Sequence, residues 1–295
     1  MAAAQCTASA IFTNLTQDHL DFHPTMEDYF AAKRKLFEAA PEIKVVNVDD
    51  PYGARLAAET GGAITVGIES PDADLRATDL RFDFTGSPFT ADGLQLRSPL
   101  PGRFNVLNVL GAVAVVRALG VDDATIAAAL PGAGRVPGRF EPVEEGQDFA
   151  VLVDYAHTPD SLENVLRAAR PLTQGRLVCV FGCGGDRDRG KRPQMGAISA
   201  ALADRTIVTS DNPRSEDPEA IVAEILAGIE DRSRTEAIVD RHAAIERAVG
   251  TAGAGDVVVI AGKGHEQGQE FEGGRKVPFD DVTVAREALR ARLDA

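Results

Sequence analysis

The segment TSDNPRSEDP, residues 209–218, places charged and amide side chains around a proline directly after a short apolar run. Asp211, Asn212 and Arg214 surround Pro213, whose ring fixes one backbone dihedral and limits the freedom of the loop. Asn-Pro and Asp also favour simple turns, so this segment alone does not distinguish a turn from a binding site. The distinction depends on whether other strands end in similar clusters.

Three further polar clusters in the second half of the chain also follow apolar, β-branched runs. They are Asp154 with His157, Arg187 with the glycines that precede it, and the segment 262–266, which ends in Glu266. Because ligands of open parallel α/β sheets bind beyond the carboxyl ends of the strands, we expect all four clusters to face one cleft. The alternative is that each cluster is an ordinary solvated loop.

The residue types in these clusters predict the charge of the ligand. Arg187 and Arg214 can each hold a carboxylate through two parallel hydrogen bonds, whereas Asp211 and Glu266 suit an ammonium. A small zwitterion with more than one charged end would satisfy this mixture. The alternative for Asp211 and Arg214 is an internal salt bridge of little energetic value.

A near-match to a phosphate-binding loop is rejected. Gly185, Gly190 and Lys191 have the spacing of a P-loop, but Arg192 replaces the Ser or Thr that would hold magnesium. Two aspartates between the glycines would also face the phosphates.

The first half contains a candidate for a modified lysine. Residues 25–40 have the capping residues and apolar spacing of an amphipathic helix, and Lys33 lies on its apolar face. A partly buried lysine loses its proton more easily, and the neutral amine can add carbon dioxide to form a carbamate, an anion that can hold magnesium. His19 could be a second ligand of that metal. The alternatives are a lysine that extends to water and a structural histidine.

Asn105 and Asn108 lie three residues apart at the expected start of another helix. Their amides could read the edge of a nucleotide base. Capping of the helix is the simpler explanation from sequence alone.

The clusters of the second half need parallel strands to position them. Apolar runs alternate with helical patterns, the runs at 149–155, 176–182, 205–210, 236–240 and 256–262 and the helices starting near Pro159, Arg192, Asp217, Arg241 and Val282. This alternation predicts a parallel sheet covered by helices on both faces.

The first half is less regular. It is expected to hold a helix at 25–40, a strand at 43–50, a β region at 63–98 and a helix at 105–119. The segment 131–142 is dense in Gly and Pro and is predicted to link two domains, 1–136 and 137–295.

Composition restricts the possible partners and compartment. A formal net charge of −14 over 295 residues disfavours duplex nucleic acid and anionic membranes as partners. Cys6, Cys179 and Cys183 form no even disulfide framework, which favours a reducing cytoplasm. No apolar run reaches the roughly 18 to 20 residues that span a bilayer, and the first ten residues lack the basic start of a signal peptide. We therefore expect a soluble chain.

Seven ordered blocks make the chain similar to a known family. They are FTNLTQDHLDFHPTMEDYFAAK, GRFNVLNVLGA, PGRFE, VDYAHTPDSLENVL, GCGGDRDRGKRPQMG, TSDNPRSEDP and GKGHE. On these blocks the chain resembles the Mur ligases of peptidoglycan synthesis over nearly its whole length. The resemblance implies an α/β fold in which a partial central ATPase-type domain precedes a Rossmann-like, mostly parallel domain that binds the incoming amino acid. In this family DNPR is typical of members that select meso-2,6-diaminopimelate, and lysine-adding relatives lack this arginine.

The resemblance also implies roles for individual residues. Lys33 corresponds to a carboxylated lysine and His19 to a histidine of the magnesium site. The expected ATP contacts are Asn105, Asn108, Arg139, Asp154 and His157. The expected diaminopimelate contacts are Arg187, Asp211, Asn212, Pro213, Arg214, Gly262 and Glu266.

The activity that the resemblance implies is amide-bond formation. ATP would phosphorylate the γ-carboxylate of D-glutamate in UDP-MurNAc-L-Ala-D-Glu, and the amine of diaminopimelate would attack the acyl phosphate. Magnesium would neutralise charge on the phosphoryl oxygens. The partners would be small-molecule substrates, with no nucleic acid and no membrane, and the chain would be a cytoplasmic monomer.

One departure from the family lies at the N-terminal end of the sequence. Members begin with a UDP-binding domain, a P-loop and an acidic metal-binding segment before the block that starts here at Phe12. We therefore expect a truncated chain with a complete amino-acid site. The alternatives are a non-catalytic module that binds diaminopimelate and a related amide ligase, such as cyanophycin or folylpolyglutamate synthetase, which DNPR beside GKGHE disfavours.

Overall fold

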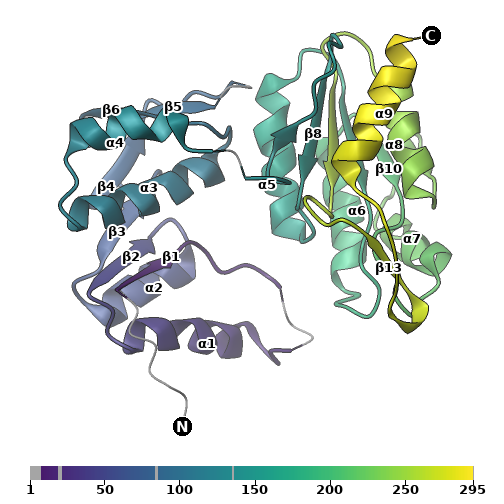
Figure 1. The fold of residues 1–295 in the computed structure, drawn as a ribbon. Coiled ribbons are helices and arrows are strands. Elements are labelled where there is room, and N and C mark those ends of the chain that lie inside the picture. Colours follow the sequence, from purple (N-terminus) through teal and green to yellow (C-terminus); the bar gives the residue numbers. More distant parts are fainter. Residues whose placement is uncertain (1–7, 19–21, 84–85, 135, 295) are drawn as a thin grey trace. The chain divides into compact units, whose positions relative to one another are not determined.

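The chain forms two compact units, residues 1–134 and 135–295 (Figure 1). The computed structural model describes residues 8–18, 22–83, 86–134 and 136–294, so His19 and Cys6 lie outside the described residues. Within these ranges each unit contains one six-stranded sheet, in the orders β1-β2-β3-β4-β5-β6 and β11-β10-β9-β12-β8-β7. The predicted α/β class with mostly parallel sheets is confirmed. The predicted domain boundary between 136 and 137 lies close to the division between the units.

The first unit combines a parallel and an antiparallel part. Its parallel strands are β1 (Ser9–Phe12), β2 (Ile43–Asn47), β3 (Ile64–Gly67) and β4 (Leu75–Thr78), and its antiparallel strands are β5 (Ser87–Ala91) and β6 (Leu94–Ser98). Its helices are α1 (Met26–Glu38), α2 (Pro51–Thr60), α3 (Arg103–Ala118), α4 (Asp123–Ala129) and the short η1 (Leu130–Gly132).

Helix α1 forms as its sequence predicts, but its lysine is not buried. Thr25 caps the helix by accepting a 3.1 Å hydrogen bond from the backbone N–H of Asp28, and Phe30 and Phe37 are buried. Lys33 is exposed, with its Nζ 5.3 Å from the centre of the Tyr29 ring. The predicted partial burial is wrong because the packed stripe of α1 is narrow and the long side chain extends past Tyr29 to water.

The second unit is a mostly parallel sheet with helices on both of its faces. Its strands are β7 (Glu141–Pro142), β8 (Ala150–Asp154), β9 (Leu177–Phe181), β10 (Arg205–Val208), β11 (Thr235–Ala237) and β12 (Val257–Ala261). All pair in parallel except β7, which is antiparallel to β8. The helices are α5 (Pro159–Ala169), η2 (Arg170–Leu172), α6 (Lys191–Leu202), α7 (Pro218–Leu226), α8 (Arg241–Thr251) and α9 (Asp281–Leu293). A two-stranded hairpin, β13 (Gln269–Phe271) and β14 (Arg275–Val277), is joined by η3 (Glu272–Gly274).

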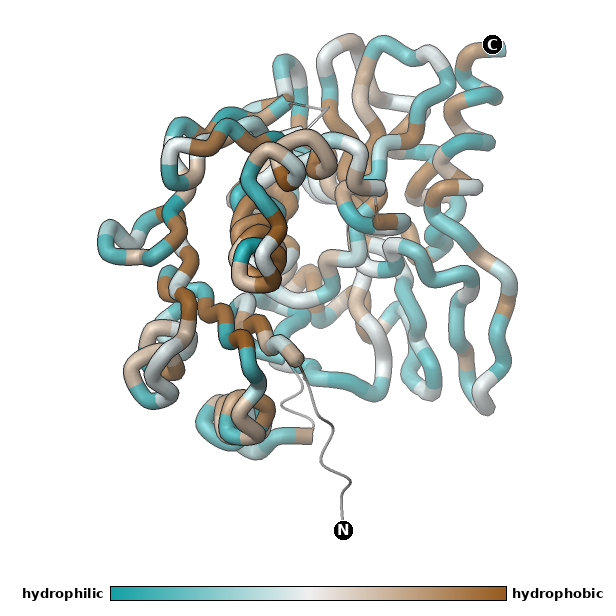
Figure 2. The backbone as a smooth tube through the Cα atoms, turned by 60° about the vertical axis from the view of Figure 1, so that its left-hand side comes forward, coloured by the Kyte–Doolittle hydropathy of each residue, from teal (hydrophilic) through white to brown (hydrophobic). Residues whose placement is uncertain are grey.

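Burial on both faces explains the apolar strands of this unit. Helices α5 and α6 lie on one side of the sheet and α8 and α9 on the other (Figure 1). Val151 and Val153 pack in one cluster with residues of α8 and α9, while Leu152 between them is also buried and points to the opposite face. Figure 2 shows hydrophobic stretches inside this unit, with mainly hydrophilic loops between them.

Two sequence-based assignments are corrected. The strand expected at 236–240 is β11, which begins at Thr235 and ends at Ala237. Part of the expected linker 131–142 belongs to the second unit, because β7 pairs with β8 and Phe140 is buried. Among the described residues, no helix has the length and apolar character needed to cross a membrane.

A buried ion pair joins the starts of α8 and α9 to the sheet. Arg241 donates to both carboxylate oxygens of Asp281, at 2.8 and 2.7 Å, and neither side chain reaches solvent. Arg241 also donates to the carbonyls of Ala261, at 3.0 Å, and Ser210, at 3.4 Å. These carbonyls lie at the carboxyl ends of β12 and β10, so one guanidinium ties both helices to the edge where those strands end.

We predict that Arg241→Met lowers the free energy of unfolding of the second unit by about 3–5 kcal/mol, because Asp281 is left buried and unpaired. Hydrogen exchange of the β12 amides measures the change. The double variant Arg241→Met/Asp281→Leu should recover part of the loss. As a control, Arg167→Met on α5, an exposed partner of Glu163, should cost less than about 1 kcal/mol. Equal losses for Arg241→Met and Arg167→Met would contradict the prediction.

Candidate functional site

The loops that follow β8, β9, β10 and β12 contact one another at the carboxyl edge of the second sheet. The backbone N–H of Gly262 donates to the carbonyl of Asp154 at 3.1 Å, and that of Gly185 donates to the carbonyl of Asn212 at 2.8 Å. The predicted gathering of these loops is therefore present in the fold.

Two glycines allow this close approach. A Cβ at Gly185 would lie 1.9 Å from the carbonyl oxygen of Pro213, and a Cβ at Gly262 would lie 2.6 Å from a carboxylate oxygen of Asp211. Gly262 also has a φ of 119°, which L-residues rarely adopt. Side chains at these positions would push the loops apart.

A buried lysine lies at the centre of the site. Lys263 is fully buried, and its Nζ lies 2.9 Å from Oδ1 of Asn212, 3.2 Å from Oε2 of Glu266 and 3.7 Å from Oδ1 of Asp211. The same Glu266 oxygen accepts a 2.9 Å hydrogen bond from the amide of Asn212. Sequence analysis missed Lys263, although it stands inside the GKGHE block.

The charge of Glu266 is set by this network. Partial burial raises its pKa, but the hydrogen bond from Asn212 and the charge of Lys263 outweigh burial and hold the pKa of Glu266 below its ordinary value. Glu266 is therefore an anion at neutral pH.

Arg214 is held by the loop after β9 and by the hairpin. Its Nη1 donates to the carbonyl of Gly185 at 2.7 Å, and its Nε lies 3.1 Å from Oε2 of Glu270. Its backbone N–H donates to the carbonyl of Glu270, and its φ is 52°, in the left-handed region that is uncommon for arginine. The alternative of an internal salt bridge holds with other partners: among the described residues Arg214 pairs with Glu270, and Lys263 lies 3.7 Å from the carboxylate of Asp211, so the two residues do not pair with each other.

Three of the predicted amino-acid contacts line one pocket of about 390 Å³. Its lining is Asn212, Arg214, Glu266, Gln267, Gly268, Glu270 and Lys276. Asp211 and Gly262 belong to the same loops but are not part of this lining, and Pro213 lines a second hollow. Arg187 is exposed and donates to the carbonyl of Asp186, yet both its Cγ and the Nη1 of Arg214 lie within 4 Å of a Cβ built at Gly184.

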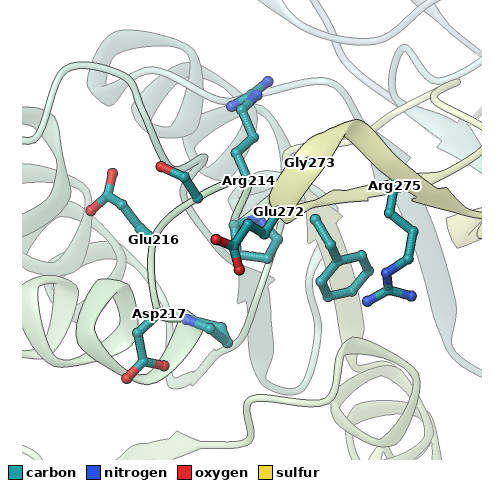
Figure 3. A pocket seen from close by; sticks show the side chains of 10 residues that line it. Arg214, Glu216, Asp217, Glu272, Gly273 and Arg275 are labelled. Carbon is teal, nitrogen blue, oxygen red and sulfur yellow. The ribbon is translucent and has the colours of Figure 1, made fainter.

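A second hollow of about 720 Å³ shares Arg214 with this pocket. Glu216 and Asp217 line it from the loop before α7, while Glu272 and Arg275 line it from the hairpin (Figure 3). Glu216 belongs to a buried network, because Arg192 donates to both of its carboxylate oxygens at 2.7 and 2.9 Å. Arg192 therefore holds the loop that carries Arg214.

Asp154 is engaged with the backbone. Its carboxylate accepts hydrogen bonds from the N–H groups of Phe140, at 2.7 Å, and Ala156, at 2.8 Å. Burial nevertheless raises the pKa of Asp154 to about 6. Asp154 thus anchors the segment that contains Arg139, whose guanidinium lies 4.7 Å from the centre of the Tyr155 ring.

The remaining predicted nucleotide contacts differ in burial. His157 packs its ring edge against Tyr155, and its Nδ1 lies 2.9 Å from the Tyr155 carbonyl. Asn105 is buried and donates to the carbonyl of Pro101 at 2.8 Å, while Asn108 is exposed. The capping explanation is wrong, because the N-cap of α3 is Gly102 and no side chain caps it.

The predicted magnesium ligands Lys33 and His19 are not tested by the described residues. Nowhere in the ranges that the structure describes do three His, Cys, Asp or Glu side chains gather as metal ligands. Lys33 as an ammonium is a donor and cannot ligate a cation. The predicted magnesium ligands Lys33 and His19 remain a prediction.

Comparison with known protein families gives a match for each unit. The Mur ligase middle domain matches residues 4–116, and the domain described as "Mur ligase, glutamate ligase domain" matches residues 138–264. The chain belongs to the Mur ligase family. The two matches fall on the two units and together include most of the chain.

Individual relatives show how much of a Mur ligase is represented here. The chain is 54% identical over 293 residues to "UDP-N-acetylmuramoyl-L-alanyl-D-glutamate--2,6-diaminopimelate ligase" of Gloeobacter violaceus, covering 96% of this chain and 59% of that protein. The enzyme of the same name from Syntrophomonas wolfei is 49% identical, with 96% and 60% covered. A solved structure of a ligase of that name matches with a TM-score of 0.63 and 38% identity over 97% of this chain and 60% of that one. The chain thus spans about three fifths of the length of these Mur ligases.

We predict that the Asp154 carboxyl titrates with a midpoint near pH 6, as measured by ¹³C NMR of aspartate Cγ and assigned with Asp154→Asn. Because the folded pKa lies above the ordinary value of 3.8, the contribution of Asp154 to stability is complete below about pH 3.8 and is lost as pH rises through 6. Asp256 is the control. Its partial burial is outweighed by hydrogen bonds from Arg176, which leave its pKa below the ordinary value. A midpoint for Asp154 below pH 4 would contradict the prediction.

Proposed function

We propose that the chain carries the meso-diaminopimelate site of an ATP-dependent Mur ligase that extends UDP-MurNAc-L-Ala-D-Glu by one residue. The observation that supports this proposal is the pocket in which Arg214 lies beside Asn212, Glu266 and Glu270. Relatives that are about half identical over nearly the whole chain carry the name of this ligase.

The pocket fits an amino acid with a zwitterionic end. Arg214 supplies a cation for a carboxylate, and Glu266 and Glu270 supply anions for an ammonium. Diaminopimelate has a carboxylate and an ammonium at each end, whereas lysine has only an ammonium at its distal end. Lysine would leave Arg214 without the carboxylate, and this loss favours diaminopimelate.

The residues of this chain would bind and orient the nucleophile. Lys263 fixes Asn212 and Glu266, and Gly185 and Glu270 fix Arg214, so the pocket is organised before the ligand arrives. Holding one end of diaminopimelate leaves the amine of the other end to attack the activated carboxyl group. ATP, for which Arg139, Asp154, His157, Asn105 and Asn108 are the proposed contacts, would supply the activation by phosphorylating the γ-carboxylate of D-glutamate.

The proposal extends to partners. The substrates are small molecules, and the net charge of −14 opposes binding to nucleic acid. A cytoplasmic monomer remains the proposed state, and magnesium remains the proposed cation, with no step assigned to it.

We predict that Arg214→Ala weakens binding of meso-diaminopimelate by about 10- to 100-fold, the range for losing a hydrogen-bonded charge. Isothermal titration calorimetry of the whole chain measures the change. Arg167→Ala, which removes an exposed arginine on α5, is the matched control and should leave diaminopimelate binding unchanged. Similar affinity of wild type and Arg214→Ala for diaminopimelate would refute the role of Arg214.

Phosphate release tests whether this chain also catalyses. With ATP, UDP-MurNAc-L-Ala-D-Glu and meso-diaminopimelate together, a ligase releases phosphate only when all three are present. Diaminopimelate binding without phosphate release would instead identify a binding module.

A further inference from the structure

The hairpin β13–β14 supplies part of the proposed amino-acid pocket. Glu270 on β13 and Lys276 on β14 both line it and stand opposite each other in the antiparallel register. Neither residue belongs to the DNPR or GKGHE segments. The pocket therefore has charged groups beyond those that the sequence blocks contain.

Glu270 is tied to the DNPR loop by backbone and side chain. Its N–H donates to Oδ1 of Asn212 at 3.0 Å, and its carbonyl accepts from the N–H of Arg214 at 3.0 Å. Its Oε2 lies 3.1 Å from Nε of Arg214. These contacts place the carboxylate of Glu270 beside the guanidinium of Arg214, and neither backbone contact depends on the type of side chain at position 270.

The two carboxylates in the pocket differ in how they are balanced. Glu266 already has an internal cation, because the buried ammonium of Lys263 lies 3.2 Å from it. Glu270 pairs with Arg214, the group that would turn to the carboxylate of the ligand. Lys276 faces Glu270 across the hairpin, yet among the described residues the only ion pair of Glu270 is with Arg214. When Arg214 binds the carboxylate of the ligand, Glu270 loses that partner and can accept a cation at the same end of the ligand.

We propose that Glu270 is a specificity residue that receives the ammonium of the zwitterionic end while Arg214 receives its carboxylate. This inference rests on the proposed function. In an amino acid both charged groups are attached to one carbon, so a cation and an anion held 3.1 Å apart match them side by side. A ligand whose distal end carries a carboxylate alone would leave Glu270 unpaired and close to a like charge, which disfavours that ligand.

The test compares two ligands of the same length: meso-diaminopimelate, in which both ends carry an ammonium beside the carboxylate, and pimelate, in which both ends carry a carboxylate alone. Whichever end enters the pocket, the comparison is then between a zwitterionic end and a plain carboxylate. Calorimetric titration of the whole wild-type chain should show at least about tenfold tighter binding of diaminopimelate, the factor for one charged hydrogen bond. In Glu270→Gln the amide keeps the size and can still accept from Arg214, but it has no charge. The ratio of the two affinities should then fall to about threefold or less, mainly because pimelate binds better.

Two variants separate charge from structure. Glu272→Gln makes the same change on the same hairpin segment but lines the other hollow, and it should keep the wild-type ratio. Glu270→Asp keeps the charge and should retain more of the discrimination than Glu270→Gln.

Two results would overturn the inference. An unchanged affinity ratio in Glu270→Gln would show that Glu270 does not bind the ammonium of the ligand. An equal loss of both ligands would show that Glu270 only positions Arg214. If wild type binds neither ligand, the proposed function itself fails, and this outcome is distinct from a wild type that binds diaminopimelate but is insensitive to position 270.

Discussion

The candidate site depends on one buried ammonium. Lys263 has no contact with water, and the free energy of burying its charge is offset only by the amide and carboxylate oxygens around it. Those oxygens come from the loops after β10 and β12, so the requirement to satisfy one cation fixes two loops against each other. The same contacts leave Glu266 charged and fixed in direction.

A second buried cation stabilises the same edge of the sheet. Arg241 binds the carbonyls at the ends of β10 and β12 and pairs with Asp281 at the start of α9. Arg192 pairs with Glu216, in the loop before α7, and with Glu224, on α7 itself. A chain with a large excess of acidic residues thus uses its few buried basic side chains to hold the edge of one sheet.

The sequence predicted the parts of the fold that repeat and missed those that depend on distant partners. Near-continuous apolar runs identified β8, β9, β10 and β12, because strands buried on both faces need such runs. The runs also located Asn212, Arg214 and Glu266 at one edge. The burial of Lys263 and Arg241 was not predictable, since lysine and arginine are normally exposed and only the folded contacts show what satisfies them. The exposure of Lys33 differs from the prediction for the opposite reason: helical spacing assigned its side chain to an apolar face, and the folded helix leaves that side chain in contact with water.

The pocket beside Arg214 is assembled from residues 212–276, all in the second unit. Its shape and charge are therefore local properties of that unit. Affinity for an amino acid measured at this pocket reports on the two loops and the hairpin that line it. Such a measurement therefore tests the second unit by itself, because every residue that lines the pocket belongs to that unit.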